Sequence, residues 1–232
     1  MYLSMNYKKT DKMCDLIREH YPILLVMSRF GIALGFGEQT VGEVCRRNGV
    51  DAKTFLTVVN MLVNKVNVDV IDEQVSITSL IDYLRNAHTY FLDFRLPAIR
   101  SKLIEAIAQC SESDVVIAII RYFDEYVGEV RKHMLYEEET VFPYAEALTK
   151  GKRYKGRYNI NIFIRHHDNI ESKLSELKDI IIKYFPAKSS NELNSVLFDI
   201  FSCANDLASH NDVENYLFVP AIKKIEKSLT VK

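Results

Sequence analysis

The sequence predicts an all-α protein, in which a small helical N-terminal domain precedes an up-down-up-down four-helix bundle. Three observations favour this fold. Glycine and proline, which interrupt helices, are scarce, with 8 and 5 copies among 232 residues. Apolar residues recur at steps of three and four positions, which is the spacing of one buried helix face. The helical patterns are long and their connections are short, as in antiparallel bundles.

Composition and charge exclude several classes of protein. Hydrophobic residues make up 48% and charged residues 26%, which is ordinary for a globular chain that buries a core. The formal net charge is −1, so no basic excess favours a nucleic acid as partner. No apolar run approaches the roughly 20 residues of a membrane span, and the N-terminal MYLSMNYKKTDKMCD has no apolar signal core. We expect a cytoplasmic protein with neither nucleic acid nor membrane as partner.

The cysteines are widely spaced and form no CxxC pair, which favours reduced thiols over a disulfide framework or a cysteine-only metal site. They are Cys14, Cys45, Cys110 and Cys203.

The N-terminal domain is predicted over residues 1–75, and the bundle over 76–232. Residues 64–76 are polar and β-branched, which indicates a linker or short extended segment. Before it, three short helices are predicted at about 12–30, 40–49 and 51–64. Thr40 and Glu43 form a capping box, and Asp51 is an N-cap.

Four long helices are predicted in the bundle. Each opens on or beside a Ser, Thr, Asp or Asn that can serve as N-cap. They run from 78 or 79 to about 108, from 113 or 114 to about 148, from about 159 to 184, and from 190 or 191 to about 227.

Histidines and glutamates interrupt the apolar stripes of these four helices. The second helix places His133 and Glu137 at i and i+4, and the fourth repeats this with His210 and Glu214. That spacing puts both side chains on one helix face, one turn apart. Single histidines occupy the stripes of the first and third helices. A lone buried histidine is ordinary in a core, but a buried carboxylate is costly unless it is paired or bound to metal.

Imidazole and carboxylate ligands suit iron or manganese better than zinc. Four histidines and two bridging glutamates, with an oxo or hydroxo bridge, would give two irons roughly five ligands each. Two ferrous ions would outweigh the charge of two glutamates, so the site would attract O₂, NO or peroxide. Ferritin-like di-iron proteins use Glu-x-x-His at i and i+3, whereas this chain has the reverse order at i and i+4.

These motifs resemble the hemerythrin-like HHE cation-binding domain, and more closely the RIC (repair of iron centres) family. Proteins of that family are di-iron proteins linked to iron–sulfur cluster repair under nitrosative and oxidative stress. HMLYEEETVFP at His133 and HNDVENYLFVP at His210 carry the resemblance, which covers about residues 78–225. RHHD resembles the family's E-H-D segment and assigns His167, rather than His166, as ligand. His88 with the following Leu-Pro resembles the first-helix motif, whose alignment can shift by one residue. The resemblance therefore implies two irons on His88, His133, Glu137, His167, His210 and Glu214.

The N-terminal domain also resembles the leading domain of that family, through FGIALGFGEQTVGEVCRRNGVDAKTF. Family members often carry adjacent cysteines in the glycine-containing turn, but Leu34-Gly35-Phe36-Gly37 contains none. A role of such a pair in thiol chemistry or iron delivery is therefore in doubt here, and we expect Cys45 to be a core residue.

Several other features have competing interpretations. Residues 40–63 could form a helix-turn-helix, but the second helix has one lysine, which favours a packing or partner-docking module. The basic loop at 150–157 is either solvated or docks an acidic partner. Glu138 and Glu139 leave the apolar stripe and are expected on the solvent side. Tyr126 and Tyr144 are expected as core residues or as hydrogen-bond partners of the metal ligands.

The sequence leaves three functions open. The first is repair of iron–sulfur clusters, with iron–sulfur proteins as partners. The second is reversible binding or sensing of O₂ or NO, and the third is iron storage or transfer. Enzyme status, electron donor and oligomeric state are not predicted.

Overall fold

The computed structural model describes residues 6–65, 75–108, 114–152, 158–166, 170–185 and 191–230. Within these ranges the chain forms helices and no β-strand, apart from one isolated backbone bridge between Lys12 and Thr40. The all-α prediction is therefore confirmed. No helix in these ranges has both the length and the apolar character needed to cross a membrane.

Contacts between Cα atoms divide the chain into two compact units. The first comprises Met1–Ala87, Phe142–Arg157 and His210–Lys232, and the second comprises His88–Val141 and Tyr158–Ser209. This division does not follow the domain boundary predicted near residue 75. That boundary adjoins residues 66–74, which lie outside the described ranges, and it stays a prediction.

Three of the four predicted bundle helices are continuous but contain a π-helical segment. In each, an α-helix passes into a π-helix and then into a second α-helix. The backbone stays helical at the junctions, as the dihedral angles of Leu96 and Val219 show. The three are α5 (Ile77–Thr89), η2 (Tyr90–Arg95) and α6 (Leu96–Ala108); α7 (Asp114–Tyr136), η3 (Glu137–Val141) and α8 (Phe142–Thr149); and α11 (Asn191–Val213), η4 (Glu214–Phe218) and α12 (Val219–Thr230). The remaining predicted helix, the third along the chain, corresponds to α9 (Ile160–His166) and α10 (Ile170–Tyr184).

Each π-helical segment ends two residues before a proline, at Pro97, Pro143 and Pro220. Proline lacks an N–H donor, and its ring crowds the carbonyl four residues earlier, so it interrupts an α-helix. A turn with i→i+5 hydrogen bonds is wider and gives that carbonyl more room. The prolines therefore explain why long helices widen at these points instead of ending.

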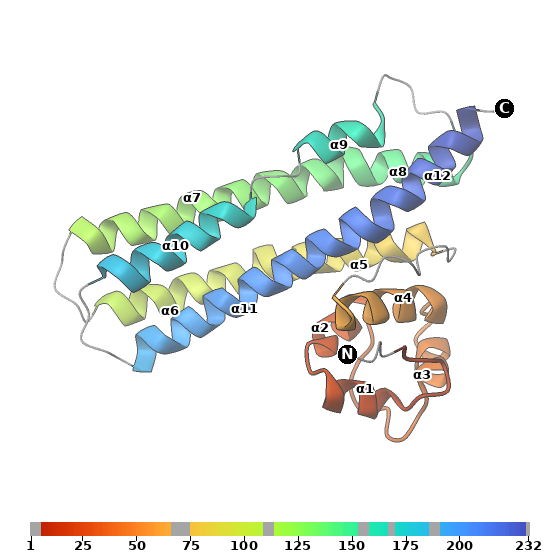
Figure 1. Ribbon diagram of the computed structural model, residues 1–232, viewed down its shortest axis with the longest axis horizontal. Helices are drawn as coiled ribbons and strands as arrows, with labels where there is room; N and C mark the ends of the chain where they lie inside the picture. The colour runs from red at the N-terminus through yellow and green to blue at the C-terminus, as the bar shows by residue number, and fades with distance from the viewer. Residues whose placement is uncertain are drawn as a thin grey trace. The chain divides into compact units, whose positions relative to one another are not determined.

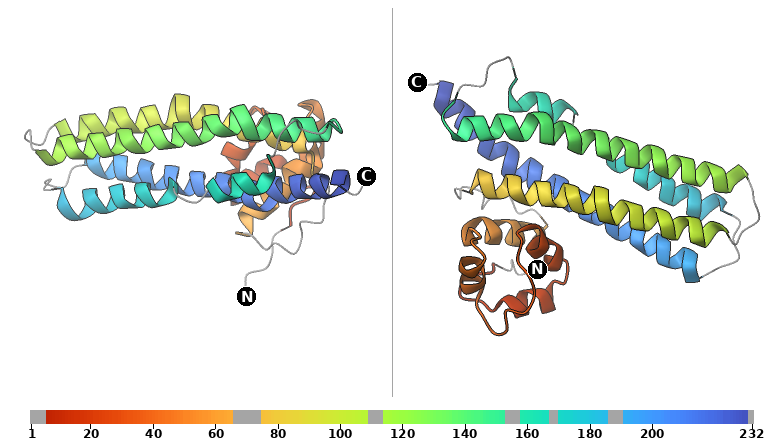
Figure 2. Two further views of the ribbon diagram at one scale, coloured as in Figure 1. Left: turned by 90° about the horizontal axis from the view of Figure 1, so that it is seen from above. Right: turned by 180° about the vertical axis from the view of Figure 1, so that it is seen from behind.

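The second unit is a bundle of α6, α7, α10 and α11, which run side by side in Figures 1 and 2. Its core contains the aromatic and aliphatic side chains that the apolar stripes predict, such as Phe123, Val130 and Ile200. Polar contacts join each helix to its neighbours around the bundle. They are Arg100–Asp124 (2.6 Å), Lys173–Glu129, Lys178 over the Phe201 ring (4.7 Å) and Lys102–Asp199 (2.7 Å). Such surface pairs contribute about 0–1 kcal/mol each, so burial of the core provides most of the stability.

In the first unit, the N-terminal helices pack on α5. They are α1 (Met13–Glu19), α2 (Ile23–Arg29), α3 (Val41–Arg47) and α4 (Ala52–Val63). The Phe30 and Tyr83 rings lie 5.0 Å apart, and the Asn86 side-chain amide donates to the Arg29 carbonyl at 2.8 Å. Tyr83 and Asn86 lie on α5, so the N-terminal helices are fixed to that helix.

Helices α3 and α4 begin where the sequence predicts, whereas the stretch predicted at about 12–30 forms two helices, α1 and α2. Thr40 and Glu43 form the expected capping box at α3. Asp51 accepts a hydrogen bond from the Thr54 N–H at 2.9 Å and caps α4. Cys45 is fully buried, which confirms it as a core residue, and burial raises the pKa of its thiol to about 11.

The Asp51 cap predicts a pH-dependent contribution to stability. Burial opposes ionisation, but hydrogen bonds from Thr54 hold the pKa of Asp51 below its ordinary value of 3.8. Because the pKa is lower in the folded state, the stabilisation is present above about pH 4 and is lost as pH falls through the folded-state pKa. Asp51→Ala should lower the free energy of unfolding by about 1 kcal/mol at pH 7, measured by urea denaturation.

The difference between wild type and Asp51→Ala should shrink at pH 3. Glu105→Ala, at an exposed position within α6, should change the free energy of unfolding by less than about 0.5 kcal/mol and serves as control. An Asp51→Ala deficit that stays constant down to pH 3 would show that the carboxylate is not the stabilising group.

Candidate metal centre

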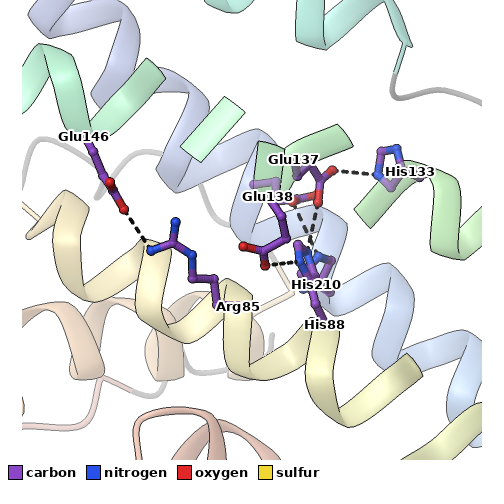
Figure 3. Close-up of polar contacts among 8 residues, drawn as sticks. Arg85, His88, His133, Glu137, Glu138, Glu146 and His210 are labelled. Atoms are coloured by element: carbon purple, nitrogen blue, oxygen red, sulfur yellow. Dashed lines mark hydrogen bonds and ion pairs between the residues drawn. The ribbon is translucent and has the colours of Figure 1, made fainter. Parts of the chain in front are cut away.

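Four of the six predicted ligands are brought together in the structure. One ligand atom from each of His88, Glu137, His210 and Glu214 lies within 4.8 Å of the other three. All four side chains are buried, with at most 3% of each residue exposed. His88 lies at the end of α5, Glu137 opens η3, and His210 and Glu214 lie at the junction of α11 and η4. Figure 3 shows the His88, Glu137 and His210 side chains converging.

The Glu137 carboxylate contacts two imidazoles. Its Oε2 lies 2.9 Å from His88 Nε2, and its Oε1 lies 2.8 Å from His133 Nε2 (Figure 3). In the second motif, Glu214 Oε1 lies 3.4 Å from His210 Nε2. Burial of an ionised carboxylate costs several kcal/mol unless a positive charge compensates it. Glu137 and Glu214 thus place negative charge where a cation would be strongly held.

The spacing of these atoms fits metal ligands. Neither oxygen of Glu137 accepts a hydrogen bond of normal geometry from the part of the chain that is described. Metal–ligand distances near 2.1 Å would place neighbouring ligand atoms about 3 Å apart and opposite ones about 4 Å apart. The separations of 2.8, 2.9 and 3.4 Å match the first value. Nitrogen and oxygen donors without sulfur are a set that iron accepts.

The other two predicted histidines differ in what is observed. His133 is 12% exposed at its side chain and stacks on the Phe163 ring of α9, with ring centroids 6.4 Å apart. It contacts Glu137 but does not belong to the group of four. His167 lies outside the described residues, so its role as ligand stays a prediction.

The π-helical segments coincide with the ligands, which the sequence analysis did not predict. Glu137 and Glu214 are the first residues of η3 and η4, and His88 lies two residues before η2. Short π-helical turns within α-helices are frequent at functional sites, because the wider turn changes the direction of side chains. The sequence feature that could have predicted these segments is a proline within each long helical pattern, in the pairs Leu-Pro, Phe-Pro and Val-Pro.

The expectation that Glu138 lies on the solvent side is met only in part. Its side chain is 30% exposed, and its Oε1 lies 2.8 Å from His88 Nδ1. Departure from the apolar stripe of its own helix does not mean exposure, because α5 brings His88 alongside η3. Glu139, the next residue, is exposed as expected.

The two tyrosines named from the sequence lie in buried positions. Tyr126 is 1% exposed on α7, and its role as a partner of the ligands stays a prediction. Tyr144 donates its hydroxyl to Glu226 of α12 at 2.5 Å. Burial, reinforced by that carboxylate, raises the pKa of Tyr144 above its ordinary value.

The helices and the buried histidine–carboxylate group define an all-α protein with a non-haem metal site. A sequence profile of the hemerythrin HHE cation-binding domain matches residues 79–222. The match covers more than half of the chain and spans all six predicted ligands, so the chain belongs to the hemerythrin HHE cation-binding domain family. Membership and the His/Glu group together indicate a non-haem iron protein. No curated protein is significantly similar in sequence.

Deletion of Thr140 tests whether η3 exists to place Glu137. A π-turn holds one residue more than an α-turn, so the deletion should replace η3 by a tighter turn, kinked by Pro143, while α7 and α8 keep their buried faces. Helical content measured by circular dichroism should stay near wild type, and bound iron should fall below half.

The matched control is deletion of Glu125. This residue lies within α7, a regular α-helix without a π-turn. There the register of all later residues rotates by about 100°, so the bundle should lose stability. Full iron content in the Thr140 deletion would contradict this account of η3.

Proposed function

We propose that this protein is a di-iron protein that repairs iron–sulfur clusters damaged by nitric oxide or oxidative stress, and that it acts in the cytoplasm. His88, His133, His167 and His210 would be terminal ligands, and Glu137 and Glu214 would bridge the two irons. The observation that supports this most is the buried group of His88, Glu137, His210 and Glu214 in a chain of the HHE family. Two ferrous ions would supply redox chemistry and open positions for O₂, NO or peroxide.

The residues of the chain perform three tasks in this proposal. The two buried carboxylates supply a charge of −2, which holds the cations but leaves two ferrous ions with a positive excess. The apolar stripes around the ligands exclude water; Val130 and Met134 of α7 and Val141 of η3 are at most 1% exposed. Burial also fixes the ligand rotamers, because buried side chains pack closely.

The rival function is reversible O₂ or NO binding by a hemerythrin-type centre, and a third is iron storage or transfer. Repair is favoured by the N-terminal helices, which resemble the leading domain of the RIC family and which a simple carrier does not need. These helices contact α5 at Tyr83 and Asn86, just before His88. The adjacent cysteines of that family are absent, so delivery of iron through such a pair is not proposed here.

Metal analysis should give about two irons per chain after anaerobic reconstitution with ferrous iron. Glu137→Ala and His210→Ala should each lower this value, since each removes a buried ligand. Glu139→Ala, which removes an exposed carboxylate from the same π-helical segment, should leave it unchanged. A single zinc per chain and no iron would refute the di-iron centre.

Repair is tested with an enzyme whose iron–sulfur cluster has been damaged by NO. The reconstituted protein should restore its activity, whereas the Glu137→Ala variant should not. Equal restoration by the same amount of free ferrous iron would overturn the repair proposal. A diferrous spectrum that returns after oxygenation and deoxygenation would instead support the carrier function.

A further inference from the structure

Two consecutive residues of η3 contact opposite nitrogens of the His88 ring. Glu137 faces Nε2 at 2.9 Å, and Glu138 faces Nδ1 at 2.8 Å (Figure 3). The His88 side chain is 4% exposed, so its ring is held in a protein environment, with the two carboxylates on either side. Glu138 is 30% exposed and reaches the ring from the outer side.

This arrangement fixes the form of the imidazole. Of the two contacts, the one between His88 Nδ1 and Glu138 has the geometry of a hydrogen bond. An ionised carboxylate accepts hydrogen bonds and donates none, so Nδ1 bears the hydrogen of that bond. The proton on Nδ1 leaves the Nε2 lone pair free to bind a cation on the side of Glu137. Histidines that bind metals commonly donate their second N–H to a carboxylate, which orients the ring and makes it a better ligand.

The second His-x-x-x-Glu motif has no counterpart of Glu138. The residue that follows Glu137 is Glu138, whereas the residue that follows Glu214 is Asn215, which is exposed. The two motifs otherwise share the spacing from histidine through glutamate to proline. A carboxylate thus follows the ligand only in the first motif, whose Glu137 and Glu138 both contact His88.

We propose that Glu138 is a positioning residue for His88: it holds the ring as the Nδ1–H tautomer and thereby raises the affinity of one of the two metal positions. The proposal rests on the metal centre proposed above. Glu138 contacts the ligand and need not contact a metal.

The first test measures affinity with ferrous iron alone, by competition with a chelator under anaerobic conditions, on the full chain. Glu138→Ala should weaken binding of one of the two ions by about 10- to 100-fold. Glu138→Gln, which can still accept from Nδ1 but lacks the charge, should give a smaller loss. Glu139→Ala is the matched control and should bind as wild type does. Wild-type affinity in Glu138→Ala would overturn the proposal.

The second test reads the tautomer of His88 directly. In metal-free protein with ¹⁵N-labelled histidine, the His88 signals, identified by their loss in His88→Gln, should report hydrogen on Nδ1. Glu138→Ala should populate the other tautomer, while Glu138→Gln should keep the first. Glu138→Gln preserves the side-chain volume, so the tautomer can still be measured in this variant if the alanine variant does not fold. An unchanged tautomer in both variants would refute the positioning role.

The two proposals fail in different ways. If wild type binds no iron, the di-iron function fails, while the tautomer measurement still decides whether Glu138 positions His88. If wild type binds two irons and Glu138→Ala binds them equally well, only the positioning role fails.

Discussion

The burial of two glutamates among histidines is the constraint on which the rest of this structure depends. Glu137 and Glu214 have no exposed surface, and a carboxylate in such a place destabilises the fold unless positive charge is close. The polar atoms nearest to them include imidazole nitrogens at 2.8–3.4 Å, and bound cations would supply the compensating charge. Metal binding and stability are therefore coupled, because a ligand that binds only the folded state stabilises it.

The helices must widen to bring these groups together. Three long helices each contain a π-helical segment at or next to a ligand, and each segment precedes a proline. The prolines prevent ordinary α-helical hydrogen bonding there, yet the chain stays helical through each segment. The same segment also brings Glu138 to His88. One local feature of the backbone thus positions both Glu137 and Glu138 beside His88.

Much of the fold and part of the site could be predicted from sequence, because periodicity and capping are local. The stripe that contains His133 and Glu137, the capping box at Thr40 and the burial of Cys45 follow from spacing and residue type. The contact between Glu138 and His88 could not be predicted, since it depends on how α5 lies beside η3 and is not encoded within either helix. The π-helical segments were not predicted, because apolar residues already recur at steps of either three or four. One extra residue in a helix therefore leaves the apolar pattern looking regular.

The N-terminal helices pack on α5, the helix that contains His88. The central claim, however, is that Glu137 and Glu214 are buried in order to bind metal. Anomalous diffraction at the iron absorption edge, from crystals of the reconstituted protein, tests this most directly. We expect two iron peaks, each within bonding distance of both carboxylates. An ordered, folded protein with no peak beside Glu137 and Glu214 would contradict the claim.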